Sequence, residues 1–227
     1  MRRAPFPAAA LATILIAGCG GGGTKTAEIP AGGPSTQSST PAQTTPAGCK
    51  NVAKPAPKKE GGQKKPSAPL AGGKTYKLTV ATNCGTFTMQ LDTKTAPNAS
   101  ASMVALSKAG FFDNTIFHRI VPGFVIQGGD PTGTGQGGPG YKTVDKPPKN
   151  AKYTLGVVAM AKTGAEKAGT AGSQFFVVTG PDAKLPPDYA VLGKVVSGLD
   201  VVKRIGQLGD QSEQPTFNVV IQHMKSS

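Results

Sequence analysis

The sequence FHRIVPGFVIQGGD, residues 117–130, decides how the rest of the chain is interpreted. Two mostly apolar, β-prone runs flank Pro122-Gly123, a pair that is typical of a turn with proline at its second position. Each run carries one polar residue, Arg119 in the first and Gln127 in the second. Burying such side chains unpaired is costly. Arg119 and Gln127 therefore need partners or a function.

Two later stretches have a similar character. Residues 172–176, GSQFF, again place an amide, Gln174, beside aromatic residues, and residues 191–195 are VLGKV. With these three blocks in this order, the chain resembles the cyclophilin family of peptidyl-prolyl cis-trans isomerases. The resemblance extends over residues 75–223, which is most of the chain beyond its Gly- and Pro-rich beginning.

The pattern around these blocks predicts a β-rich domain over residues 75–227. Alternating polar and apolar residues at 76–82 and 86–91 predict a hairpin whose turn contains Cys84. One helix is expected to open at Pro97 and end at Gly110. Further elements are expected as strands at 155–160, 173–179, 190–196 and 216–223 and a helix at 199–205. Periodicity supports a barrel or a sandwich. The resemblance implies a mainly β fold, a closed eight-stranded antiparallel β-barrel capped by two α-helices.

The first 18 residues have the features of a secretory signal segment. Arg2 and Arg3 precede an apolar run at 8–17 that is too short to span a membrane. Residues 16–19, IAGC, resemble a bacterial lipobox, in which Cys19 is lipidated after cleavage. The alternative is an ordinary signal peptide with a cysteine there by chance. The lipobox interpretation predicts an extracytoplasmic lipoprotein, anchored stably to the cell membrane when Cys19 carries several acyl chains.

Residues 19–74 are predicted to form a flexible tether behind the lipidated cysteine, because they are rich in Gly, Ser, Thr, Pro and Lys. Two further cysteines remain, Cys49 and Cys84. In an oxidising compartment they suggest a disulfide between the tether and the first hairpin. Two free thiols are the alternative, and thiol labelling of the unreduced, unfolded protein distinguishes the two.

Composition narrows the function classes. With 31 Gly and 20 Pro, the chain has room for one medium-sized core. More than half of the formal charge of +13 lies before residue 75, but residues 24–74 contain no aromatic residue, so no nucleic-acid partner is expected. Two histidines and scattered carboxylates make no metal site. The GTGQGG match at 133–138 precedes Pro139 instead of a helix, which argues against nucleotide binding. We expect no cofactor.

The resemblance also implies a reaction. Rotation about an X–Pro bond is slow because amide resonance stiffens the C–N bond, and at the twisted transition state the prolyl nitrogen regains a lone pair. A donor aimed at that nitrogen stabilises the transition state more than the ground state, and arginine suits this role. By resemblance, the catalytic residues are Arg119, Phe124 and Gln127. The substrate-binding residues are Val125, Ala161, Gln174, Phe176, Leu185 and Tyr189. Taken alone, the apolar members would be core residues, and Arg119 part of a structural ion pair.

Several positions depart from the family pattern. Tyr189 stands where a pocket histidine is frequent, and Lys184 where many eukaryotic members carry a tryptophan. We therefore expect weak cyclosporin binding, which sub-micromolar affinity by calorimetry would contradict. Lys162 replaces a common asparagine and the segment 163–170 is longer, which leaves the sequence preference there open. His118 lies between apolar residues and is expected to be a hydrogen-bonded structural residue rather than a base.

The expected function is a monomeric peptidyl-prolyl isomerase that assists folding, with proline-containing peptides and unfolded secreted proteins as partners. Two alternatives belong to other classes. A proline-binding module or holdase chaperone would keep the fold with little turnover, but it has no need of Arg119. A solute-binding lipoprotein would need a two-lobed domain, which the barrel-like pattern disfavours.

Overall fold

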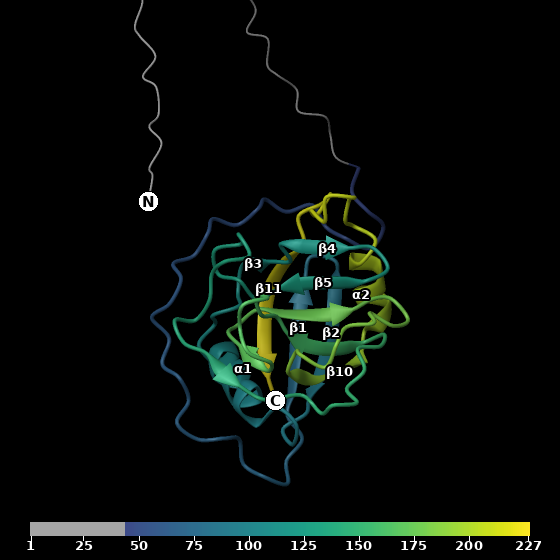
Figure 1. The fold of residues 1–227 in the computed structure, drawn as a ribbon. Helices are drawn as coiled ribbons and strands as arrows, with labels where there is room; N and C mark the ends of the chain where they lie inside the picture. The colour runs from purple at the N-terminus through teal and green to yellow at the C-terminus, as the bar shows by residue number, and fades with distance from the viewer. Residues whose placement is uncertain (1–43) are drawn as a thin grey trace, which may run out of the picture. The chain divides into compact units, whose positions relative to one another are not determined.

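The structure, a computed structural model, describes residues 44–227 (Figure 1), so the signal segment, Cys19 and the start of the predicted tether lie outside the described residues. The described part is mainly β. A nine-stranded antiparallel sheet has the order β3-β11-β1-β2-β10-β7-β9-β5-β4, and β6 pairs with β8. The strands are β1 Lys77–Thr82, β2 Gly85–Leu91, β3 Thr115–Ile116, β4 Arg119–Val121, β5 Val125–Gly128, β6 Thr143–Val144, β7 Val157–Met160, β8 Thr170–Ala171, β9 Phe175–Val178, β10 Val191–Ser197 and β11 Val220–Ser226. The helices are α1 Pro97–Lys108 and α2 Leu199–Ile205.

The predicted first hairpin is confirmed. β1 and β2 pair in register, with Val80 opposite Phe87 and Leu78 opposite Met89. These four side chains are at most 1% exposed, because the two-residue period of a strand places alternate residues on the core face. On the outer face the hydroxyls of Thr79 and Thr88 lie 3.2 Å apart.

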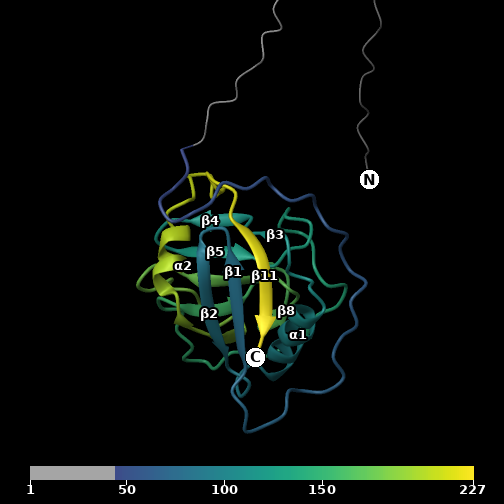
Figure 2. The same cartoon turned by 180° about the vertical axis from the view of Figure 1, so that it is seen from behind.

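The large sheet curls without closing, which corrects the expectation of a closed eight-stranded barrel. The strands β4 and β5 cross the direction of β1, β2 and β11 (Figures 1 and 2). The end strands β3 and β4 do not pair within residues 44–227, and a single bridge, Ile116 to Asp130, lies near this seam. The two end strands are short, with two and three residues, and Ile120 of β4 donates its N–H to Glu213 O rather than to β3. Between them Phe117 turns inward, fully buried, and its N–H bonds to the carbonyl of Val219.

Aromatic residues fill the centre of the curled sheet. The ring of Phe175 meets the rings of Phe112 and Phe117 edge to face, at centroid distances of 6.3 and 6.1 Å. Such contacts add to the stability gained by burying the rings. The helix α1 packs against β11 and β6, and α2 packs against β2. Pro97 occupies the first turn of α1, as predicted. The free N–H groups of this turn are capped by a residue far along the sequence, because Asp145 accepts hydrogen bonds from Asn98 N and Ala99 N.

Residues 44–74, which we call the N-terminal strap, pack along the outside of the domain (Figures 1 and 2). This corrects the prediction that the flexible tether extends to residue 74, because the compact unit begins at residue 43. The strap has no helix or strand, yet its backbone N–H groups at Lys58, Gly61 and Gln63 bond to carbonyls of Pro131, Gly138 and Pro139. The ammonium of Lys58 donates to carbonyls just beyond α1, at Gly110, Phe111 and Asp113.

A disulfide between Cys49 and Cys84 joins the strap to the turn between β1 and β2. The pairing is the one that the cysteine count suggested. Hydrogen bonds surround it: Lys50 N donates to Asn83 O at 2.7 Å, and Asn83 Nδ2 donates to Lys50 O at 2.8 Å. The start of the strap is therefore held both covalently and by its backbone.

Candidate active site

The centre of the site is the β4–β5 hairpin together with β9. Pro122 and Gly123 form the predicted turn, in which Gly123 has φ +73°, a conformation that glycine adopts at no steric cost. In the resulting register Arg119 lies opposite Gln127, and Gln127 lies opposite Phe176 on β9. Residues at one level of adjacent strands share a face of the sheet, so these three side chains lie side by side.

A pocket of about 310 Å³ opens beside this row. Its lining residues are Arg119, Phe124, Val125, Gln127, Ala161, Lys162, Phe176, Leu185 and Tyr189. Eight of the nine sequence-predicted site residues therefore converge, and the ninth, Gln174, is bonded to Gln127. Val125 and Phe176 are buried, and Phe124 and Leu185 are partly exposed at the edge. The pocket has an apolar floor with a cation and amides at its rim, an arrangement suited to a small apolar ring joined to a polar backbone.

Tyr189 completes the pocket wall, and a second tyrosine supports it from behind. The ring of Tyr189 meets Phe176 edge to face, with centroids 5.5 Å apart. Behind it, the buried Tyr153 donates its hydroxyl to Tyr189 O at 2.7 Å and accepts from Tyr189 N at 3.1 Å. Tyr153 was not predicted as a site residue. It lies outside the matching blocks, and nothing near it in the sequence indicates that it supports Tyr189.

The guanidinium of Arg119 is held from two sides. Its Nε donates to Glu213 Oε2 at 2.6 Å, and its Nη1 donates to Gln127 Oε1 at 3.4 Å. Its Cζ lies 5.9 Å from the centroid of the Phe124 ring. The hydrogen bond from Arg119 lowers the pKa of the Glu213 carboxyl, so this carboxyl is ionised at neutral pH. Arg119 therefore forms a structural ion pair with Glu213 and also lines the pocket, so the two roles considered for it do not exclude each other.

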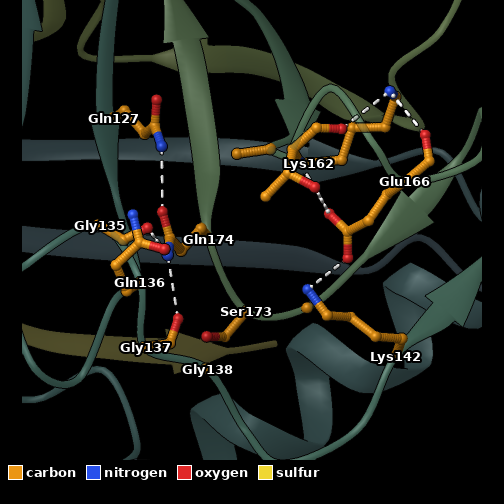
Figure 3. Close-up of a pocket in the computed structure, with 13 residues that line it drawn as sticks. Gln127, Gly135, Gln136, Gly137, Gly138, Lys142, Lys162, Glu166, Ser173 and Gln174 are labelled. Carbon is orange, nitrogen blue, oxygen red and sulfur yellow. Dashed lines mark hydrogen bonds and ion pairs between the residues drawn. The ribbon is translucent and has the colours of Figure 1, made fainter. Parts of the chain in front are cut away.

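Side-chain amide hydrogen bonds lead from Gln127 through Gln174 into a glycine-rich loop (Figure 3). Gln127 Nε2 donates to Gln174 Oε1 at 3.0 Å, and Gln174 Nε2 donates to the carbonyls of Gly135 and Gly137 at 2.9 and 3.0 Å. The loop is folded around the fully buried Asp130, whose carboxylate accepts bonds from the N–H groups of Thr132, Gly135 and Gly137. The glycines therefore serve this turn, because a Cβ at Gly137 would collide with the Asp130 carboxylate.

A second, more polar pocket of about 110 Å³ lies on the far side of Gln174 (Figure 3). Lys142 Nζ pairs with Glu166 Oε1 across it at 2.8 Å. Lys162 lines both pockets and is almost fully buried. Its ammonium lies 2.6 Å from Asp188 Oδ2 and 5.5 Å from the centroid of the Tyr189 ring. Lys162 thus borders both pockets, whereas Thr163 and Glu166 of the segment after it line only the polar one.

His118 differs from the prediction. Both ring nitrogens are buried, and neither has a hydrogen-bond partner among residues 44–227, so the expected hydrogen-bonded role is wrong. Burial lowers the pKa of His118, with a smaller opposing effect of Asp130, and the ring is neutral at pH 7. A base for proton transfer is not part of the reaction expected for this family.

Within 44–227, no group of three or more His, Cys, Asp or Glu side chains could hold a metal ion. No helix in the same range is long and apolar enough to cross a membrane.

Comparison with known proteins agrees with this geometry. Residues 77–226 match the family model of cyclophilin type peptidyl-prolyl cis-trans isomerases. The chain is 38% identical over 158 residues to the peptidyl-prolyl cis-trans isomerase CYP18-2 of Arabidopsis thaliana, covering 67% of this chain and 94% of that protein. It is 40% identical over 149 residues to peptidyl-prolyl cis-trans isomerase-like 1 of Neurospora crassa, covering 63% and 90%.

Solved structures give the same result. A cyclophilin type isomerase of Cryptosporidium parvum superposes with a TM-score of 0.63 at 33% identity, covering 68% of this chain and 98% of that one. The same protein has a crystal structure determined in the presence of the dipeptide Ala-Pro, with a TM-score of 0.61. The match covers the curled sheet, both helices and every residue of the apolar pocket, and the chain therefore belongs to the cyclophilin-type peptidyl-prolyl cis-trans isomerase family, whose enzymatic activity it carries.

Proposed function

We propose that this isomerase works outside the cytoplasm, anchored to the cell membrane through lipid on Cys19, and accelerates X–Pro rotation in secreted proteins as they fold. The signal-like first 18 residues and the IAGC motif support an exported, lipidated chain. The Cys49–Cys84 disulfide supports an oxidising compartment, because such bonds persist there and are rare in the cytosol.

The substrate is an extended peptide segment whose proline ring enters the apolar pocket. Phe124, Val125, Phe176 and Leu185 surround the ring. Ala161, which lines both pockets, and Gln174, which lines the polar pocket, lie along the peptide. The single observation that carries the proposal is the presence of Arg119 at the rim of this pocket, with its guanidinium near the Phe124 ring and its Nη1 donating to Gln127. A receptor that only bound proline would not need a fixed cation at that point.

In the reaction, the peptide bond before proline twists and its nitrogen becomes pyramidal and basic. Arg119 donates a hydrogen bond to that nitrogen, which it cannot do while the nitrogen lone pair is delocalised in the planar amide. Gln127 orients Arg119 and accepts or donates to the substrate backbone. No bond is made to the enzyme and no proton is transferred. The donor's charge makes the bond stronger than one between neutral groups.

A coupled assay tests this mechanism. The full-length protein and its Arg119→Ala variant are compared on a short X–Pro peptide with a protease that cleaves only the trans form. We expect the variant to keep its thermal unfolding midpoint and to lose at least about 100-fold in kcat/KM, which corresponds to a charged hydrogen bond of roughly 3 kcal/mol. Wild-type turnover in a folded Arg119→Ala protein would refute the mechanism.

The proposed location has its own test. Cells producing the full-length protein or Cys19→Ser are given radiolabelled palmitate, and the protein is followed by fractionation and by access of an external protease. We expect wild-type protein to carry label and sediment with membranes, and Cys19→Ser to carry none. Unlabelled wild-type protein in the cytoplasmic fraction would refute both the anchor and the extracytoplasmic role.

A further inference from the structure

Glu213 touches the proposed catalytic arginine, although it lies 94 residues further along the chain. It belongs to the turn between α2 and β11. Its carboxylate meets Nε of Arg119 rather than the Nη groups, which leaves the Nη edge of the guanidinium free to face the pocket. Nη2 has no hydrogen-bond partner within residues 44–227, so it is the donor available to a ligand.

The backbone of Glu213 is in a conformation that a glutamate rarely adopts. Its φ is +66°, and only Asn114 and Lys184 share a positive φ among the described non-glycine residues. For a residue with a long side chain this conformation costs about 1–2 kcal/mol, which glycine would avoid. A strained residue at the rim of a site indicates that its side chain has a role there.

The turn that carries Glu213 is rigid. Asp210 Oδ1 accepts bonds from Ser212 N, Ser212 Oγ and Gln214 N, and Glu213 N donates to Asp210 O. The Glu213 carbonyl in turn accepts from Ile120 N at 3.1 Å, next to Arg119 on β4. Because these bonds are made by backbone or by Asp210, they remain when the Glu213 side chain is changed. The backbone from which the Glu213 side chain extends to Arg119 is thus held at a fixed place relative to β4.

We propose that Glu213 is a positioning residue for Arg119: it fixes the Nε edge of the guanidinium so that the Nη groups stay aimed at the prolyl nitrogen of the substrate. The inference rests on the proposed role of Arg119. Arginine has a long side chain with several rotatable bonds, and Gln127 alone, at 3.4 Å, restrains it weakly. A catalytic group that is correctly oriented before the reaction raises the rate without making the substrate bind more tightly.

The test separates positioning from structural support. Glu213→Gly removes the side chain and suits the positive φ, whereas Glu213→Gln keeps the length and an oxygen that accepts from Nε. Asp200→Asn is the matched control, because it also removes one negative charge from an ion pair with an arginine, the exposed Asp200–Arg204 pair on α2. The full-length proteins are studied by NMR exchange on an X–Pro peptide, which gives the rotation rate of bound peptide and its Kd separately.

We expect Glu213→Gly to lower the rotation rate of bound peptide about tenfold, with Kd changed less than about twofold and no loss of thermal stability. Glu213→Gln should stay within about threefold of wild type, and Asp200→Asn should match wild type. A Glu213→Gly protein with the wild-type rotation rate overturns the inference, as does Glu213→Gln falling as far as Glu213→Gly. Arg119→Ala, measured beside them, separates the two proposals: if it loses rotation and Glu213→Gly does not, only the role of Glu213 fails. If Arg119→Ala keeps rotation, the proposed mechanism fails first.

Discussion

Breaking the bond between Cys49 and Cys84 tests how far the N-terminal strap is part of the folded protein. The change is Cys49→Ser, which leaves the fully buried Cys84 side chain in place. The disulfide spans a sequence separation of 35 residues. In the chain-entropy description, closing a loop of this length restricts the unfolded chain by about 4 kcal/mol at 25 °C. For a domain of this size that corresponds to a fall in the melting midpoint of roughly 8–16 °C.

The assay is thermal unfolding by circular dichroism, with and without reductant, together with urea unfolding. The Cys49→Ser protein should melt lower than wild type and be insensitive to reductant, whereas reduced wild type should approach it. The urea m-value should rise, because the unfolded chain without the cross-link exposes more surface. Isomerase activity at 25 °C should be unchanged, since the bond lies away from the pocket residues. A fall of less than about 2 °C after verified reduction would refute the loop-entropy reasoning.

Two further predictions concern side chains that support the site. Burial acts to raise the pKa of Asp130, but hydrogen bonds from Thr132, Gly137 and Gly135 outweigh it and lower the pKa. The ionised carboxylate therefore stabilises the folded protein above about pH 4, and this stabilisation is lost as pH falls through the folded pKa. Asp130→Asn should therefore lower the free energy of unfolding by about 2–3 kcal/mol at pH 7 and by progressively less toward pH 3. Urea unfolding measures this, with Asp200→Asn as the control. A difference between the two proteins that does not depend on pH would contradict the prediction. Tyr153→Phe should leave two backbone groups of Tyr189 unpaired, cost about 1–2 kcal/mol and raise the KM for peptide several-fold with kcat nearly unchanged. Tyr141→Phe, which loses one bond to Ser102 away from the apolar pocket, is the matched control, and an equal rise in KM in both proteins would count against a role for Tyr153.

Long periodic elements were predictable from the sequence, and short ones were not. The alternation in β1 and β2 and the Pro-to-Gly span of α1 placed these elements within a few residues of their observed bounds. The strands β3, β6 and β8 have two residues each, too few for any period, and exist only because tertiary neighbours pair with them. The open seam of the sheet was missed for the same reason, since it depends on how these short strands end.

The site was predictable where its residues stand out locally. Arg119 and Gln127 are polar residues in apolar strands, and the family blocks carry Phe124 and Phe176. Glu213 gave no such signal, because a glutamate in a polar turn is ordinary until the fold brings it beside β4. The strap was mispredicted because it has few large apolar residues, although Leu70 packs against the core. Its other contacts are the disulfide, backbone hydrogen bonds and the bonds of the Lys58 ammonium, which composition does not encode.

The disulfide also decides where mechanical load enters the enzyme. A pull on the chain at Thr44 passes through Cys49 directly to Cys84, so residues 50–83 form a closed loop that carries no tension. That loop contains most of the strap and the whole of β1, which lies between β11 and β2 in the sheet. Force therefore arrives at Gly85, at the start of β2, and reaches β1 only through the pairing of β1 with β2 unless the covalent bond breaks. If the protein is held through its N-terminal side, as proposed above, the load therefore reaches the sheet at β2 and not at β1.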